Sequence, residues 1–127
     1  MGEISPHVDT RSKILTLAAA LELRPPLAIA TGYFDVLRAE HARELAGVRH
    51  HPLLVVVLPL ANEILALPAR AELVAALRVV DYVVTTDYDD LDRLIESLKP
   101  VELVRLEAAD GRRARQLMEH VHSRQTS

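Results

Sequence analysis

The chain has 127 residues, of which 50% are hydrophobic and 26% charged, an ordinary composition for one globular domain. A net charge of −3 makes nucleic acid an unlikely partner, and the absence of cysteine excludes disulfides, zinc–thiolate sites and cysteine nucleophiles. The sequence shows neither a signal peptide nor an apolar run long enough to span a membrane. We therefore expect a cytoplasmic protein, with a flexible N-terminus over 1–9 and a single domain over 10–127.

Two kinds of apolar segment alternate along the chain. Short continuous runs rich in Val, Ile and Leu are typical of buried strands, whereas apolar residues spaced three or four apart predict helices. In chain order, the patterns predict a helix over 10–23, a strand over 27–34, a helix over 38–48, a strand over 52–60, a helix over 69–80, a strand over 81–87, a helix over 89–99, a strand over 101–107 and a helix over 110–124.

This alternation of strands and helices predicts an α/β fold. Successive strand–helix–strand units build a parallel sheet with helices on both faces, so we expect a three-layer Rossmann-like fold of four to five parallel strands. In such open sheets, ligands bind beyond the carboxyl ends of the strands. The loops over 31–38, 59–68 and 85–90 are therefore the places to look for a site.

The stretch TGYFDVLRAEHAREL (31–45) carries the clearest motif. It resembles the start of the cytidylyltransferase-like nucleotidyltransferases, whose signature is G-x-F-D-x-x-H-x-G-H. The segments over 69–84 and 94–104 continue the resemblance in the same order. The whole is similar to the nucleotidyltransferase domain of ADP-heptose synthase and to glycerol-3-phosphate cytidylyltransferases, which implies the HIGH-type nucleotidyltransferase variant of the Rossmann-like fold.

The resemblance implies an activity and a set of residues. The family joins a nucleotide, CTP or ATP, to a small phosphorylated molecule and releases pyrophosphate with the help of Mg²⁺. It also implies a bacterial protein and a homodimer, and no metal held by the protein itself. The resemblance assigns nucleotide binding to Gly32, Tyr33, Phe34, Asp35 and His41, and catalysis to His41, Arg38 and Arg70.

The chain departs from the family at several anion-binding positions. Arg38 stands in place of the first histidine, and Glu40 in place of the inner glycine, where its charge opposes a phosphate. The loop over 58–68 is apolar and has no lysine. These losses predict a catalytically impaired protein that serves as a dimerisation, ligand-binding or scaffold module, with a protein partner as one possibility. The alternative is an active nucleotidyltransferase.

Each candidate residue also has a structural interpretation, which the sequence leaves open. Glycine, aromatic and charged residues at a strand-to-helix turn have ordinary packing and capping roles. These alternatives are a turn glycine at Gly32, a core side chain at Phe34, a helix cap at Asp35, a solvent-facing His41, an Arg38 paired with Asp35 or Glu40, and an Arg70 paired on the helix surface with Glu63 or Glu72.

Overall fold

The structure is a computed structural model, which describes residues 10–35, 39–48 and 50–107. Arg38 and the helix expected over 110–124 lie outside these ranges. Within them, no helix is both long and apolar enough to cross a membrane. The elements are a 3₁₀ turn η1 (Thr10–Lys13), β1 (Ile14–Leu15), α1 (Leu17–Leu21), β2 (Ala28–Gly32), α2 (Ala39–Ala46), β3 (Leu53–Val57), α3 (Leu67–Ala75), β4 (Tyr82–Thr85), α4 (Tyr88–Leu98) and β5 (Glu102–Arg105).

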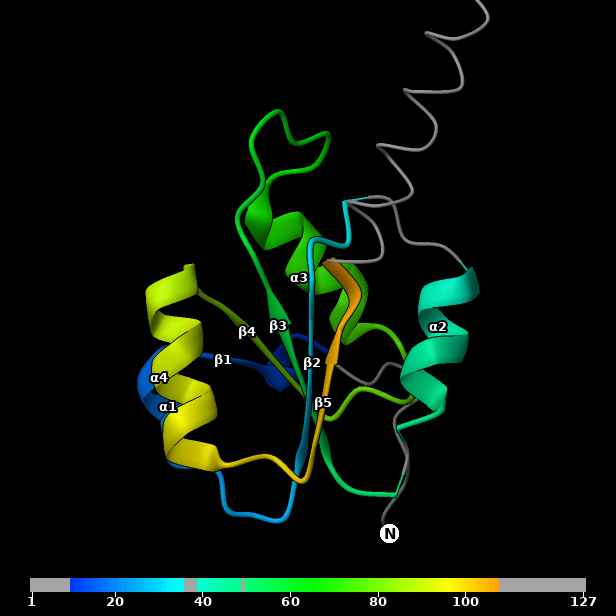
Figure 1. The fold of residues 1–127 in the computed structure, drawn as a ribbon. Helices are drawn as coiled ribbons and strands as arrows, with labels where there is room; N and C mark the ends of the chain where they lie inside the picture. Colours follow the sequence, from blue (N-terminus) through cyan, green and yellow to red (C-terminus); the bar gives the residue numbers. More distant parts are fainter. Residues whose placement is uncertain (1–9, 36–38, 49, 108–127) are drawn as a thin grey trace, which may run out of the picture.

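The centre of the molecule is a five-stranded sheet in the order β1-β4-β3-β2-β5. Every strand pair is parallel. Helices α1 and α4 cover one face, and α2 and α3 cover the other (Figure 1). The predicted three-layer Rossmann-like fold is thus confirmed, with five strands.

The core has two halves, one on each face of the sheet. Alternate residues of β2 and β3 point into the two halves, and every residue of both strands is buried. This explains why these segments read as continuous apolar runs, because a strand covered on both faces has no solvent side to carry polar residues.

The N-terminal segment differs from its prediction. The helix expected over 10–23 is replaced by η1, the two-residue strand β1 and the short helix α1. Ile14 and Leu15 pair with Val83 and Val84 of β4, so partners distant in sequence override the local helical spacing. Thr16 caps α1 by accepting a hydrogen bond from the N–H of Ala19.

The carboxyl ends of the strands meet at one edge of the sheet. The loop between β3 and α3, residues 58–66, projects beyond this edge (Figure 1). The chain passes over one face through α2 after β2, and over the opposite face through α4 before β5. Because β2 and β5 are neighbours in the sheet, the point where the strand order reverses lies between them, and ligands of such folds bind there.

Candidate functional site

Arg70 ties together the loops at the carboxyl edge. Its side chain lies in α3 and is 0% exposed. Nη1 donates to the carbonyl oxygens of Tyr33 and Leu58 at 2.7 and 2.8 Å, and Nε donates to that of Leu65 at 3.1 Å. Nη2 pairs with Glu63 Oε2 at 2.7 Å. Of the two carboxylates considered from the sequence, Glu63 is the partner, but the guanidinium is buried rather than on the helix surface.

Asp35 holds the same loop from the other side. Both of its carboxylate oxygens accept from the N–H of Ile64, at 3.0 and 2.8 Å, and Oδ1 accepts from the N–H of Leu65 at 2.8 Å. The carboxylate therefore fixes the main chain of the 58–66 loop near its end. Asp35 and Arg70 together fasten the loop after β3 to the turn after β2, so the two loops form one unit.

The contacts of Asp35 predict a pH dependence of stability. The hydrogen bonds from the N–H groups of Leu65 and Ile64 hold the pKa of Asp35 below its ordinary value of 3.8. A lowered folded-state pKa stabilises the fold above the unfolded-state pKa, and this contribution is lost as the pH falls through the folded-state pKa. We expect Asp35→Asn to lower the melting temperature at neutral pH, with a deficit that shrinks in acid.

Thermal melts of both proteins between about pH 6 and about pH 2 measure this deficit. A deficit of constant size over the whole range would contradict the prediction.

Gly32, Phe34 and His41 form a packed group on the α2 side of the sheet. A Cβ on Gly32 would lie 2.8 Å from Cε2 of Phe34, so the glycine makes room for the ring. Phe34 adopts a positive φ of 53° and is buried, which confirms it as a core residue. His41 is 3% exposed and meets the Phe34 ring edge-on, with centroids 5.6 Å apart. The alternative of a solvent-facing histidine is wrong.

Two tyrosines lie on the α4 side of the same edge. The hydroxyl oxygens of Tyr33 and Tyr88 are 2.8 Å apart, which joins the end of β2 to the start of α4. Burial, reinforced by the hydrogen bond with Tyr33, raises the pKa of Tyr88 to about 12. Tyr88 is therefore neutral at physiological pH, and the two side chains present hydroxyl groups at this edge.

A further contact at this edge escaped the sequence analysis. Thr31, the fully buried residue before Gly32 in β2, donates its hydroxyl hydrogen to Oε1 of Glu107. The side chain of Glu107 is 11% exposed, and its Oε2 lies 4.0 Å from Nη1 of Arg105. Thr31 lies near the end of β2, and Glu107 comes two residues after the end of β5. Because β2 and β5 are parallel neighbours, both residues lie near the carboxyl edge, and the sequence could have indicated this placement.

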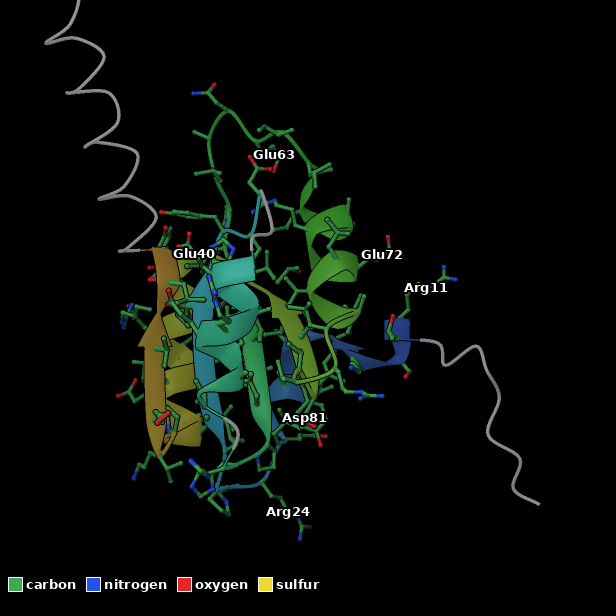
Figure 2. All side chains as sticks on the ribbon, turned by 90° about the vertical axis from the view of Figure 1, so that its right-hand side faces the viewer. Arg11, Arg24, Glu40, Glu63, Glu72 and Asp81 are labelled. Carbon is green, nitrogen blue, oxygen red and sulfur yellow. The ribbon has the colours of Figure 1, made fainter. Side chains whose placement is uncertain are left out.

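The described residues offer little for a metal ion. They contain no group of three or more His, Asp or Glu side chains arranged to hold one. Among them, the hydroxyl of Thr86, just after β4, is a buried side-chain oxygen without a hydrogen-bond partner. Glu40 lies in the first turn of α2, at the same end of the molecule as Glu63, whereas Asp81 lies at the opposite end (Figure 2).

Comparison with solved structures shows a likeness in fold. No model of a protein family matches the chain, and no curated protein sequence matches it significantly. The crystal structure of the lipopolysaccharide core biosynthesis protein from Thermoplasma volcanium GSS1 matches with a TM-score of 0.55 and 25% sequence identity. The match covers 61% of this chain and 71% of that one. The chain is thus similar in fold to a protein of lipopolysaccharide core biosynthesis.

Proposed function

We propose that the chain is a nucleotidyltransferase-like protein whose catalysis is impaired and which serves as a ligand-binding, dimerisation or scaffold module in the cytoplasm. The observation that supports this proposal most directly is the burial of Arg70. Its guanidinium is wholly buried and donates to main-chain carbonyls and Glu63. A cation that stabilises the charge of departing pyrophosphate has to face the ligand, and this one faces the protein.

The 58–66 loop supports a binding role. The side chain of Ile64 is 74% exposed, although its main-chain N–H is fixed by Asp35. A loop held in one conformation loses little entropy when it binds, and an exposed apolar side chain on such a loop suits a protein partner better than a triphosphate. We therefore propose contact through this loop with a protein partner, with a second copy of the chain as one candidate.

An active nucleotidyltransferase is the second candidate. His41 stands within the first turns of α2 against Phe34, and the structural relative is named as a lipopolysaccharide core biosynthesis protein. In this role the residues nearest the nucleotide would be Gly32, Tyr33, Phe34, Asp35 and His41. Its phosphates would be held by Arg38 and His41. Mg²⁺ belongs to this candidate as the ion that accompanies the nucleotide, because proteins usually hold it through substrate phosphates and one or two carboxylates.

Pyrophosphate release separates the two candidates. The purified protein is incubated with CTP or ATP, Mg²⁺ and a panel of acceptors, such as glycerol 3-phosphate and sugar 1-phosphates, and pyrophosphate is measured. We expect no release above that of the His41→Ala variant. Isothermal titration with each nucleotide, run in parallel at low salt, reports whether a binding site survives without turnover.

The hypothesis of an active nucleotidyltransferase predicts a different result. Release that depends on both nucleotide and acceptor, and that falls about 100-fold or more in His41→Ala, would overturn catalytic impairment. A matched control is His51→Ala, because His51 precedes β3 at the amino end of the sheet, away from the site.

A further inference from the structure

Ligands of open parallel sheets bind beyond the carboxyl ends of the strands where the strand order reverses. The strand order of this chain reverses between β2 and β5, and we call this place the crevice. In this chain the crevice holds a carboxylate. Thr31 of β2 donates to Glu107, which follows β5 by two residues, so a side-chain contact bridges the strand ends.

The charge of this carboxylate is only weakly balanced. Arg105 pairs with it only at long range, with Nη1 at 4.0 Å from Oε2 and a side chain that is 47% exposed. An exposed pair at this distance interacts weakly, because solvent screens it. Glu107 itself is 11% exposed, so its charge acts on its surroundings with less screening. It adds to the effects that raise the pKa of Tyr88 in the same edge.

Glu107 takes up the hydroxyl of Thr31 at this edge. Thr31 is fully buried, and its hydroxyl has one hydrogen to give. A phosphate in the crevice would have to displace Glu107 from Thr31, or lie beside it within about 5 Å of a like charge. Either course weakens binding.

We propose that Glu107 excludes phosphate groups from the crevice between β2 and β5 and so sets the charge of the ligands that this protein accepts. The inference rests on the proposed function, for which it names a cause: the crevice is closed to polyphosphates by a residue of the chain itself. Neutral ligands with hydroxyl groups remain compatible with Thr31, Tyr33 and Tyr88.

A charge series at position 107 tests the proposal. Inorganic pyrophosphate and CTP, both without acceptor, are titrated into the wild type, Glu107→Gln and Glu107→Lys by calorimetry at low salt. Glutamine keeps the acceptor for Thr31 and removes the charge, and we expect about a ten-fold tighter Kd for both probes. Lysine reverses the charge and is expected to bind more tightly still.

A variant on the same strand controls for net charge. Glu102→Gln changes the total charge by the same amount, but Glu102 lies at the amino end of β5, exposed and away from the crevice. We expect its Kd for both probes to equal that of the wild type. Thermal melts identify any variant that fails to fold. Because two substitutions are made at position 107, the affinity of the remaining variant still tests the proposal if one of them does not fold.

The outcomes separate the inference from the proposed function. Equal affinities in Glu107→Gln, Glu107→Lys and the wild type, or no binding by any of them up to about 5 mM probe, would overturn the inference. Catalytic impairment is judged independently by pyrophosphate release from the wild type. Turnover by the wild type together with tighter binding by Glu107→Gln would overturn the proposed function and leave the exclusion by Glu107 standing.

Discussion

Replacing Arg70 by methionine is expected to lower the free energy of unfolding by about 3–5 kcal/mol. Methionine fills much of the same space but donates no hydrogen bond. The carbonyl oxygens of Tyr33, Leu58 and Leu65 would lose their partner, that of Leu58 in the buried core and the other two in partly buried positions. Glu63 adds little to the cost, since its side chain is 40% exposed and can be hydrated. Urea unfolding followed by circular dichroism measures the difference.

Two further variants sharpen this prediction. Arg70→Lys keeps the charge but has one nitrogen in place of the planar fork, so it is expected to recover only part of the loss. Arg78→Met removes an exposed arginine beyond the end of α3 and should change the free energy of unfolding by less than about 0.5 kcal/mol. A loss in Arg70→Met no larger than that in Arg78→Met would show that Arg70 does not hold the loops.

Replacing Phe34 by alanine is also expected to cost about 3–5 kcal/mol of unfolding free energy. The ring is 1% exposed and lies against Gly32, Leu106 and His41. Its removal leaves a cavity that the rigid strand ends cannot close. The backbone strain stays the same, because alanine has the same Cβ as phenylalanine at the positive φ of 53°. Thermal and urea unfolding both report the change.

The leucine variant at the same position is the matched control. Phe34→Leu keeps most of the apolar volume and should cost clearly less than Phe34→Ala. The ring also supports His41, so Phe34→Ala is expected to alter the NMR signals of the His41 imidazole, whereas those of His51 stay in place. Equal losses in the alanine and leucine variants would show that the apolar volume of the ring is not what stabilises this site.

Most of the fold was predictable from the sequence because its strands carry a strong local signal. β2 and β3 are buried on both faces, so their apolar runs are unbroken and end at glycine or proline. β1 was not predictable, because two residues are too few for a pattern and their strand character comes from pairing with Val83 and Val84. A helical spacing in the surrounding segment concealed it.

The site was predictable in its location but not in its contacts. The loops after the strands do bring Tyr33, Asp35 and Arg70 together, as the parallel sheet requires. The acceptors of Arg70 are mainly carbonyl oxygens. Because every residue has a carbonyl oxygen, no side-chain pattern in the sequence predicts which ones Arg70 contacts. The contacts of Asp35 were equally hard to predict, because its partners are main-chain N–H groups rather than particular side chains. Arg38, on which the resemblance places a phosphate contact, stays a prediction because it lies outside the described residues.

The strand order has a consequence for how the chain folds. β2, β3 and β4 are consecutive in the chain and adjacent in the sheet, so each of their pairings closes a loop of moderate length. The two edge strands pair over much longer sequence separations, because β1 pairs with β4 and β5 pairs with β2 across most of the described chain. Closing longer loops costs more chain entropy and raises the contact order. We therefore expect the sheet to grow outward from its centre, with the crevice between β2 and β5 completed late.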